Sequence, residues 1–519
     1  MSGKKSPAPA ISKNKADKPE DIWQIYFVQL ILLTTILRLL FAALAELKYE
    51  EAYYWCYGAH LNLSYFDHPP LTGWLIYLFT YFGGQSELMV RLPAIILFTG
   101  LLGIIFKLTS QMFSSKTAFI TCAIMSCLPA FAWYSMMMLP DAPLLFFWTV
   151  GLMYGYKIIK EENTYAWWAV GIATGLGMLS KYPALLIPLA PILYIVFAKR
   201  WKLLQNIHFA GSLLAAAVIF SPVLYWNAQH EWCSFIFQGI SRFHDAKTTD
   251  FANRFGGTWL NQLLILSPGG FILIIWALVK AWQRRAETAV RYLLCSALPF
   301  LGLIALVSCL RLVQMNWALP GYLAAAIIAG AELERCQMWA KRKWLAVLIF
   351  TPAILISLLP LAGTLFPLGA LNRANDFRGW KEVAKAIAQD VGRMPNPNAV
   401  FIAGTGYQIS AELAYYMQQP ELVYSSNLWG LDKDAKGFAY WSDPRNLIGC
   451  DAIIVTYDEL RSDGQWHQRG DFEEEPCRRH FESLVKSENF TVYYGGKPLR
   501  RYRIYLAHNY KGLQNTQSE

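Results

Sequence analysis

Long apolar runs recur along this chain of 519 residues. Most runs hold roughly 18 to 23 residues, and a helix of that length crosses a hydrocarbon core roughly 30 Å thick. The bilayer core offers no water to the backbone, so a run that crosses it must fold as a helix. The runs lie at residues 24–45, 88–107, 117–137, 142–159, 165–180, 182–198, 207–226, 258–280, 291–309, 316–334 and 344–365. The sequence therefore predicts a polytopic α-helical membrane protein with about 11 transmembrane helices.

The composition agrees with this class. Hydrophobic residues make up 55% of the chain and charged residues 16%, whereas soluble domains are roughly a quarter charged. The net charge of +10 would also suit a nucleic-acid ligand. However, the basic residues lie mostly in short loops between apolar runs, and the chain has neither zinc-ligand spacing nor a Gly-rich phosphate loop. We therefore expect no nucleic-acid partner.

The basic residues also predict the orientation in the membrane. With a cytoplasmic N-terminus, the cytoplasmic loops carry most of the Lys and Arg, as the positive-inside rule requires. These residues are Lys4, Lys5, Lys13, Lys15, Lys18, Lys107, Lys116, Lys157, Lys160, Lys199, Arg200, Lys202, Arg284, Arg285, Lys341, Arg342 and Lys343. An odd number of spans then places the C-terminal part outside the cytoplasm.

Three parts are expected along the chain. Residues 1–22 are rich in Lys, Pro and Ser and predict a disordered cytoplasmic tail, and residues 23–365 form the transmembrane domain with outer loops at 46–87 and 227–257. Residues 366–519 form a small outer domain. Its predicted strands at 399–402 and 452–456 and its predicted helices at 376–391 and 408–418 indicate an α/β fold. A disulfide between Cys450 and Cys477 stays open, because the outer side can be oxidising.

An acidic pair follows the first run. Glu50 and Glu51 precede Tyr53 and Tyr54, so a general base would lie beside a flat stacking surface. The alternative is an ordinary acidic loop whose aromatic residues anchor it in the interface.

Two further acidic positions are predicted at the same depth. Asp67 and His68 follow Tyr65 and precede two prolines that restrict the backbone. Asp141 lies between the third and fourth runs and is a candidate second acid. The alternatives are a plain turn at Asp67 and a helix cap at Asp141.

Four cations complete the candidate set: Lys181, Arg242, His244 and Arg311. Together they are suited to a phosphate or diphosphate, although each alone is also explained as a snorkelling or headgroup-facing charge. Arg38 lies inside the first run and would need an acid on a neighbouring helix.

Six short motifs come in one order along the chain: Glu-Glu with Tyr-Tyr-Trp, Tyr-Phe-Asp-His-Pro-Pro, Arg-Leu-Pro, Leu-Pro-Asp-Ala-Pro, Ser-Lys-Tyr and Asn-Trp-Ala-Leu-Pro. In this order they resemble bacterial GT-C glycosyltransferases of the protein O-mannosyltransferase-like family, whose relatives include lipid A aminoarabinose and galacturonic acid transferases. The resemblance covers about residues 35–335. It implies a GT-C fold, a polyprenyl-phosphate-sugar donor, and transfer on the periplasmic face of the bacterial inner membrane.

The resemblance also implies roles for single residues. Glu50 stands where the family has its catalytic Asp, and the longer side chain leaves open whether Glu50 or Glu51 is the base. Asp67 and His68 match an acid and cation that line the donor site. Asp141 matches the second acid of the cavity, and Lys181 matches a basic position at the outer membrane surface.

The chemistry agrees with these roles. Nucleotide sugars are absent outside the cytoplasm, so an activated sugar must arrive on a membrane lipid. A phosphate leaving group needs cations, and the acceptor hydroxyl needs a base. We therefore predict inverting transfer from a polyprenyl-phosphate sugar to lipid A, lipopolysaccharide or another glycan, with protein a less favoured acceptor. No cofactor is required, no metal site is predicted, and a divalent cation on the carboxylates stays open.

A transporter or flippase of a lipid-linked sugar is the alternative. It would need ionisable groups near the bilayer midplane and an internal repeat, but Arg38 is the main intramembrane charge and the sequence shows no repeat. A receptor that displays the C-terminal domain is a third reading, and it leaves the acids of the first loop without a role.

Overall fold

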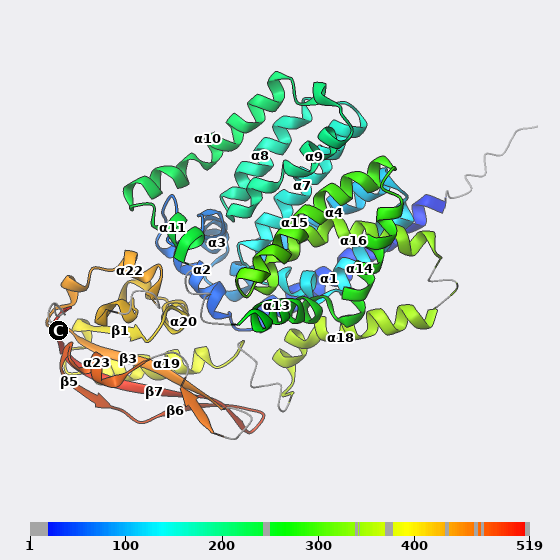
Figure 1. Cartoon of the computed structure of the whole chain (residues 1–519). Coiled ribbons are helices and arrows are strands. Elements are labelled where there is room, and N and C mark those ends of the chain that lie inside the picture. The colour runs from blue at the N-terminus through cyan, green and yellow to red at the C-terminus, as the bar shows by residue number, and fades with distance from the viewer. Residues whose placement is uncertain are drawn as a thin grey trace, which may run out of the picture.

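The computed structural model describes residues 19–241, 250–337, 341, 343–368, 377–430, 435–460, 465–468 and 472–513. Most of the predicted tail, residues 1–22, lies outside these ranges. The first helix begins at Pro19, so the last residues of the predicted tail are helical. A bundle of helices forms the larger part of the molecule, and a sheet domain built by the C-terminal residues lies against one end of it (Figure 1).

The helices of the bundle vary widely in length. They are α1 (Pro19–Leu44), α2 (Tyr49–Ala59), α3 (Leu71–Gly83), α4 (Glu87–Met112), α5 (Ser115–Cys127), α6 (Pro129–Tyr134), α7 (Asp141–Lys160), α8 (Ala166–Met178), η1 (Tyr182–Leu186), α9 (Leu189–Phe197), η2 (Trp201–Leu203), α10 (Ile207–Gln229), α11 (Cys233–Ile236), η3 (Phe237–Ser241), α13 (Phe251–Leu266), α14 (Pro268–Gln283), α15 (Thr288–Leu310), η5 (Met315–Ala318), α16 (Leu319–Arg335) and α18 (Lys343–Leu365).

The multi-pass helical class is confirmed. Within the described ranges, α1, α4, α7, α10, α15 and α18 are long and apolar enough to cross a membrane, and the bent pair α13–α14 makes a seventh if it counts as one span. The other four of the eleven predicted runs form no helix of the 18 or more residues that a candidate span requires. Run 117–137 breaks at Pro129 between α5 and α6, and α8 holds 13 residues.

The predicted run 258–280 forms a corner instead of a straight span. Helices α13 and α14 meet at an angle of 101°. Ser267 lies at the corner with φ 61°, its side chain accepts a hydrogen bond from Gly270 N at 3.3 Å, and Pro268 opens α14. Because proline lacks an N–H and suits the first helical position, it starts a new helix here.

The C-terminal domain is the predicted small α/β unit. Its strands are β1 (Val400–Gly404), β2 (Val423–Tyr424), β3 (Asp451–Leu460), β4 (Trp466–Gln468), β5 (Phe481–Lys486), β6 (Phe490–Tyr494) and β7 (Lys497–Tyr510). The main sheet order is β2-β1-β3-β7-β5, with β1 parallel to both neighbours and β7 antiparallel to β3, β5 and β6. Its helices include α19 (Trp380–Arg393), α20 (Tyr407–Met417), α22 (Phe438–Trp441) and α23 (Glu474–Arg478).

The sheet domain docks on the first loop of the bundle. Helix α20 packs against α2, as Figure 1 shows. Trp380 N donates to Glu46 Oε2 at 2.7 Å, and Leu47 N donates to Tyr416 Oη at 2.7 Å. These bonds join the start of α19 and the end of α20 to the chain that leads into α2.

Helix α8 packs against α10 at a glycine. A Cβ on Gly171 would lie 2.2 Å from the carbonyl oxygen of Ser212 and 2.7 Å from its Cα, so the two backbones touch. Small residues allow this approach between membrane helices. Because α8 ends at Met178, the packing also sets the position of Lys181.

Substitution of Gly171 by Ala should push α8 away from α10 and destabilise the protein by about 1–3 kcal/mol. Gly103→Ala in α4 is the matched control, because a Cβ there meets no atom within 4 Å. Thermal unfolding in detergent compares the two variants. Equal unfolding temperatures would contradict the close packing of these helices.

Candidate active site

A cavity of about 600 Å³ lies at the end of the bundle that carries the sheet domain. Its walls come from the 48–68 segment, the 134–141 segment, Lys181, Asn261, the 311–317 segment, and the sheet domain. Of the predicted site residues, the following line it: Glu50, Tyr53, Tyr54, Asp67, His68, Asp141, Lys181 and Arg311. Residues far apart along the chain therefore converge in one space.

The cavity lining is more basic than acidic. Its carboxylates are Glu50, Asp67 and Asp141. Its Lys and Arg residues are Lys48, Lys181, Arg311 and Lys436, and His68 adds an imidazole. An excess of cationic groups in a concave site attracts an anionic ligand.

Glu50 is the most accessible of the three carboxylates. Its side chain is 33% exposed, whereas those of Asp67 and Asp141 are 2% exposed. It lies in the first turn of α2 and forms an ion pair with Lys48 Nζ at 2.9 Å. A ligand in the cavity can thus reach Glu50 without breaking a buried network.

Asp141 is held by two donors. Lys181 Nζ lies 2.9 Å from Oδ1 and 3.2 Å from Oδ2, and Asn316 Nδ2 donates to Oδ2 at 2.8 Å. Ser180 Oγ donates to Pro140 O at 2.5 Å, which ties the two segments together. The carboxylate of Asp141 therefore orients the ammonium of Lys181 at the cavity wall.

Asp67 is the centre of a second buried network. Its Oδ1 accepts hydrogen bonds from Tyr53 Oη at 2.9 Å and from Tyr57 Oη, and Lys436 Nζ lies 3.7 Å from Oδ2. Burial raises the pKa of this carboxyl, but the charges of Lys436 and His68 and the two hydroxyl donors outweigh burial, so the pKa lies below 3.8.

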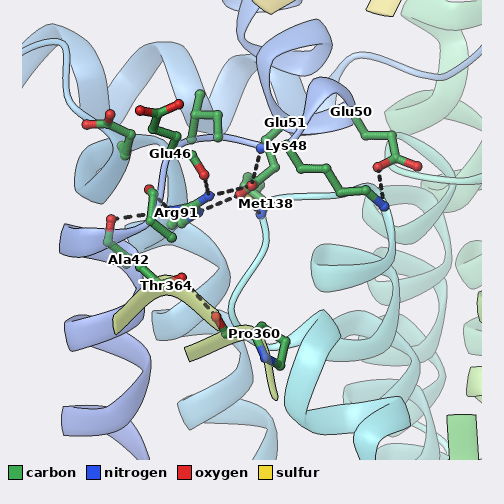
Figure 2. Close-up of polar contacts among 12 residues, drawn as sticks. Ala42, Glu46, Lys48, Glu50, Glu51, Arg91, Met138, Pro360 and Thr364 are labelled. Atoms are coloured by element: carbon green, nitrogen blue, oxygen red, sulfur yellow. Dashed lines mark hydrogen bonds and ion pairs between the residues drawn. The ribbon is translucent and has the colours of Figure 1, made fainter. Parts of the chain in front are cut away.

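Glu51 does not line the cavity. Figure 2 shows its carboxylate facing Arg91, with Nε to Oε1 at 2.8 Å and Nη2 to Oε2 at 2.7 Å, and both side chains are fully buried. Arg91 also donates to the carbonyl oxygens of Ala45 at 2.6 Å and Glu46 at 2.7 Å. Glu51 Oε2 accepts the N–H of Lys48 at 3.1 Å, which closes the first turn of α2.

The remaining predicted residues have different positions. Tyr65 lies outside the cavity lining, stacks on Tyr57 at 3.8 Å and donates to its carbonyl oxygen at 2.5 Å. Arg242 and His244 fall outside the described residues. Arg38 has no acidic partner among the residues of known position, and its Nε donates to Ser135 Oγ at 2.8 Å.

Sequence reasoning missed the contribution of the sheet domain. Lys436 and Tyr407 line the cavity, and Lys436 Nζ lies 3.7 Å from the Tyr407 ring centroid. No motif in the sequence marks these residues. Asn316 was part of a quoted motif but had no predicted role, and its bond to Asp141 becomes visible only in the fold.

Metal and disulfide chemistry were left open by the sequence. Across the ranges that the structure covers, no three His, Cys, Asp or Glu side chains group as metal ligands would. Cys450 and Cys477 are both free thiols, so the suggested disulfide between them is absent from this structure.

The fold has solved counterparts. ArnT from Cupriavidus metallidurans bound to undecaprenyl phosphate superimposes with a TM-score of 0.63 at 15% identity, and the match covers 93% of this chain and 98% of that one. Residues 67–226 match the family described as dolichyl-phosphate-mannose-protein mannosyltransferase. In fold and in these sequence motifs, the chain is similar to GT-C glycosyltransferases. The GT-C fold and the resemblance drawn from the six motifs are thereby confirmed.

Two curated proteins match in sequence. The lipid A galacturonosyltransferase RgtD of Rhizobium johnstonii is 26% identical over 327 residues, which are 61% of this chain and 66% of the relative. An uncharacterised protein of Aquifex aeolicus is 27% identical over 328 residues, which are 60% of this chain and 62% of that protein. The chain thus matches slightly less than two thirds of the length of either relative.

The buried ion pair predicts different outcomes for the two adjacent acids. Glu51→Gln leaves the charge of Arg91 buried without a full partner and should destabilise the protein by about 3–5 kcal/mol. Glu50→Gln is the matched control, because a partly exposed ion pair contributes about 0–1 kcal/mol. Thermal unfolding and the yield of folded protein report the difference. A Glu51→Gln variant as stable as Glu50→Gln would contradict a structural role for Glu51.

Asp67 predicts a specific pH dependence. A carboxyl whose pKa is depressed by folding stabilises the protein above its unfolded pKa, and this contribution is lost as the pH falls through the folded pKa. Asp67→Asn should therefore unfold at a lower temperature than the wild type at about pH 7 and about pH 5. The difference should shrink only below pH 3.8. A difference that disappears by about pH 5 would rule out the depressed pKa.

Proposed function

We propose that this GT-C protein is an inverting glycosyltransferase that moves a sugar from a polyprenyl-phosphate carrier to a glycolipid or glycan of the cell envelope. The observation that carries the proposal is the convergence of Glu50, Asp141 and Lys181 in one cavity with an excess of cations. The family supports it: ArnT is bound to undecaprenyl phosphate in its solved structure, and RgtD is a lipid A galacturonosyltransferase.

Glu50 is the base in this proposal. Of the cavity carboxylates it has the most exposed side chain, whereas Asp141 is engaged by Lys181 and Asn316. A general base must lie within hydrogen-bond reach of the proton that it removes. Glu51 serves as a positioning residue, because its carboxylate holds α2 through Arg91.

The cations receive the leaving group. Lys181, Arg311 and His68 line the cavity, and fixed donors at a developing negative charge lower the barrier more than mobile ones in water. Asp141 and Asn316 keep Lys181 in place. Tyr53, Tyr54 and Asp67 form the wall against which the donor sugar binds, while Tyr65 supports that wall through its bonds to Tyr57.

The bond changes balance without a cofactor. The acceptor oxygen forms a bond to the anomeric carbon while its proton passes to the carboxylate of Glu50. The bond between the anomeric carbon and the phosphate oxygen breaks, and its electron pair stays on the polyprenyl phosphate. Attack from the face opposite the phosphate inverts the anomeric carbon. A divalent cation on the phosphate is compatible with this scheme, since Mg²⁺ prefers oxygen ligands.

The proposed donor also supports a location for the protein. A polyprenyl carrier stays in the bilayer, so a cavity at the helix ends reaches its phosphate at the membrane surface. In this proposal the chain spans the bacterial inner membrane, the N-terminus is cytoplasmic, and the sheet domain is periplasmic. The basic residues Lys160, Arg200 and Arg284 then lie at the opposite, cytoplasmic ends of the helices.

The test is transfer in proteoliposomes that contain a polyprenyl-phosphate sugar and lipid A, followed by mass spectrometry of the glycolipids. Glu50→Gln should lower the transfer rate by at least about 100-fold with an unchanged unfolding temperature. Glu162→Gln is the control, because Glu162 is 72% exposed and pairs with Arg200. Full activity of Glu50→Gln would overturn the assignment of the base. Counterflow of the lipid-linked sugar without a new glycosidic bond would favour a flippase.

A further inference from the structure

A second cavity of about 400 Å³ is lined partly by sequence neighbours of residues that line the candidate catalytic cavity. Phe66 lines the second cavity, whereas its neighbour Asp67 lines the first. The sheet domain contributes to both, with Lys436 in the first and Tyr440 in the second. Phe237 lines the second cavity, and the next side chain, Gln238, donates to the carbonyl oxygen of Asp67. The hydrogen bond from Gln238 to the backbone of Asp67 therefore connects the linings of the two cavities.

Aromatic rings form one side of the second cavity. The ring of Phe66 lies 4.6 Å from that of Phe237 and is stacked on that of Tyr440 at 5.3 Å and 24°. Gln229, His230 and Glu231 supply polar groups. A sugar ring has apolar C–H faces that suit the negative face of an aromatic ring, and hydroxyls that need donors and acceptors. This lining therefore matches a carbohydrate better than a purely apolar ligand.

The polar groups are rigidly oriented. His230 Nδ1 lies 2.8 Å from the carbonyl oxygen of Trp226, and the two rings are stacked at 3.9 Å. A carbonyl oxygen only accepts, so Nδ1 is the donor in this contact. The hydrogen bond and the stacking together fix the orientation of the His230 ring at the cavity.

Backbone strain is concentrated at the same place. Glu231 and Trp232 are consecutive non-glycine residues in the left-handed region, with φ of 53° and 58°. The carbonyl oxygen of Asn227 accepts the N–H groups of His230 at 3.1 Å and Trp232 at 2.9 Å, and its side chain accepts from Ser234 at 2.7 Å. Such conformations persist only when the surroundings impose them and cluster at ligand sites. The strained turn delivers Glu231 to the cavity.

The second cavity lies at the C-terminal end of α10, a helix long and apolar enough to cross a membrane. Of its lining, Ile236 is 45% exposed, and Tyr225 and Trp232, which flank the lining residues 229–231 in the sequence, are 59% and 47% exposed. Exposed Tyr and Trp at the end of a spanning helix are typical of the membrane–water interface. A carbohydrate that reaches this depth is one carried by a lipid.

We propose that the second cavity is an acceptor subsite, which binds a non-reacting sugar ring of a membrane glycolipid on Phe66 and Tyr440 with hydrogen bonds to His230 and Glu231. This inference rests on the proposed glycosyl transfer and adds the place and the residues that recognise the glycolipid acceptor. Remote binding of this kind positions the reacting hydroxyl in the first cavity.

The test uses the full-length protein in nanodiscs with lipid A as the probe. Tyr440→Ala and Glu231→Gln should each raise the Kd for lipid A and the KM for lipid A by about tenfold or more. The KM for the polyprenyl-phosphate sugar should stay unchanged. Tyr440→Phe keeps the stacked ring and should bind like the wild type. Tyr493→Ala is the matched control, because Tyr493 is a 61% exposed tyrosine on strand β6.

The outcomes separate the two proposals. Tyr440 is 45% exposed, so its truncation leaves the core intact, and an unchanged unfolding temperature verifies this. Unaltered Kd and KM in Tyr440→Ala and Glu231→Gln would overturn the subsite while transfer by the wild type continues. Wild-type binding of lipid A that is no tighter than binding of phosphatidylglycerol would also overturn it. Binding that depends on Tyr440 without any sugar transfer would instead overturn the proposed enzyme activity.

Discussion

The candidate site depends on the buried ion pair between Glu51 and Arg91. Arg91 on α4 binds the carboxylate of Glu51 through two of its nitrogens. It also donates hydrogen bonds to two backbone carbonyl oxygens just after the end of α1. Glu51 in turn accepts the N–H that begins α2. Taking two charges out of water is costly unless their hydrogen bonds are satisfied, and here they are. The pair therefore joins three helix ends at one point and sets the direction in which α2 leaves the bundle.

The direction of the neighbouring Glu50 side chain follows from the ion pair between Glu51 and Arg91. Successive residues of a helix point about 100° apart, so when Glu51 faces the buried guanidinium, Glu50 must face elsewhere, and it faces the cavity. The sheet domain then completes the wall: Lys436 reaches Asp67, and the N–H of Gly437 donates to Tyr53 Oη at 3.0 Å. The buried carboxylates of Glu51, Asp67 and Asp141, each held by hydrogen bonds, thus surround the more accessible carboxylate of Glu50.

Elements with strong local patterns were predictable. The continuous apolar runs at 24–45 and 207–226 became α1 and α10, and the buried strand at 452–456 became the centre of β3. Strand β7 (Lys497–Tyr510) escaped prediction, because it holds several Arg and Lys residues and alternates buried with partly exposed positions. The corner at Ser267 also escaped, since both of its helices are apolar and only their 101° angle separates them from one span. Hydropathy measures the solvent preference of a segment, and it gives no information about the angle between two consecutive helices.

The sequence by itself determined the membrane class and most of the charged side chains that meet in the cavity, including Glu50, Asp67, Asp141 and Lys181, because charges between apolar runs must gather where the runs end. Only the tertiary structure decided which of two adjacent acids faces the cavity, that Asp141 orients Lys181, and that Lys436 arrives from a separate domain. The physical reason is that these roles depend on partners, and a partner distant along the chain leaves no trace in the local pattern of either residue.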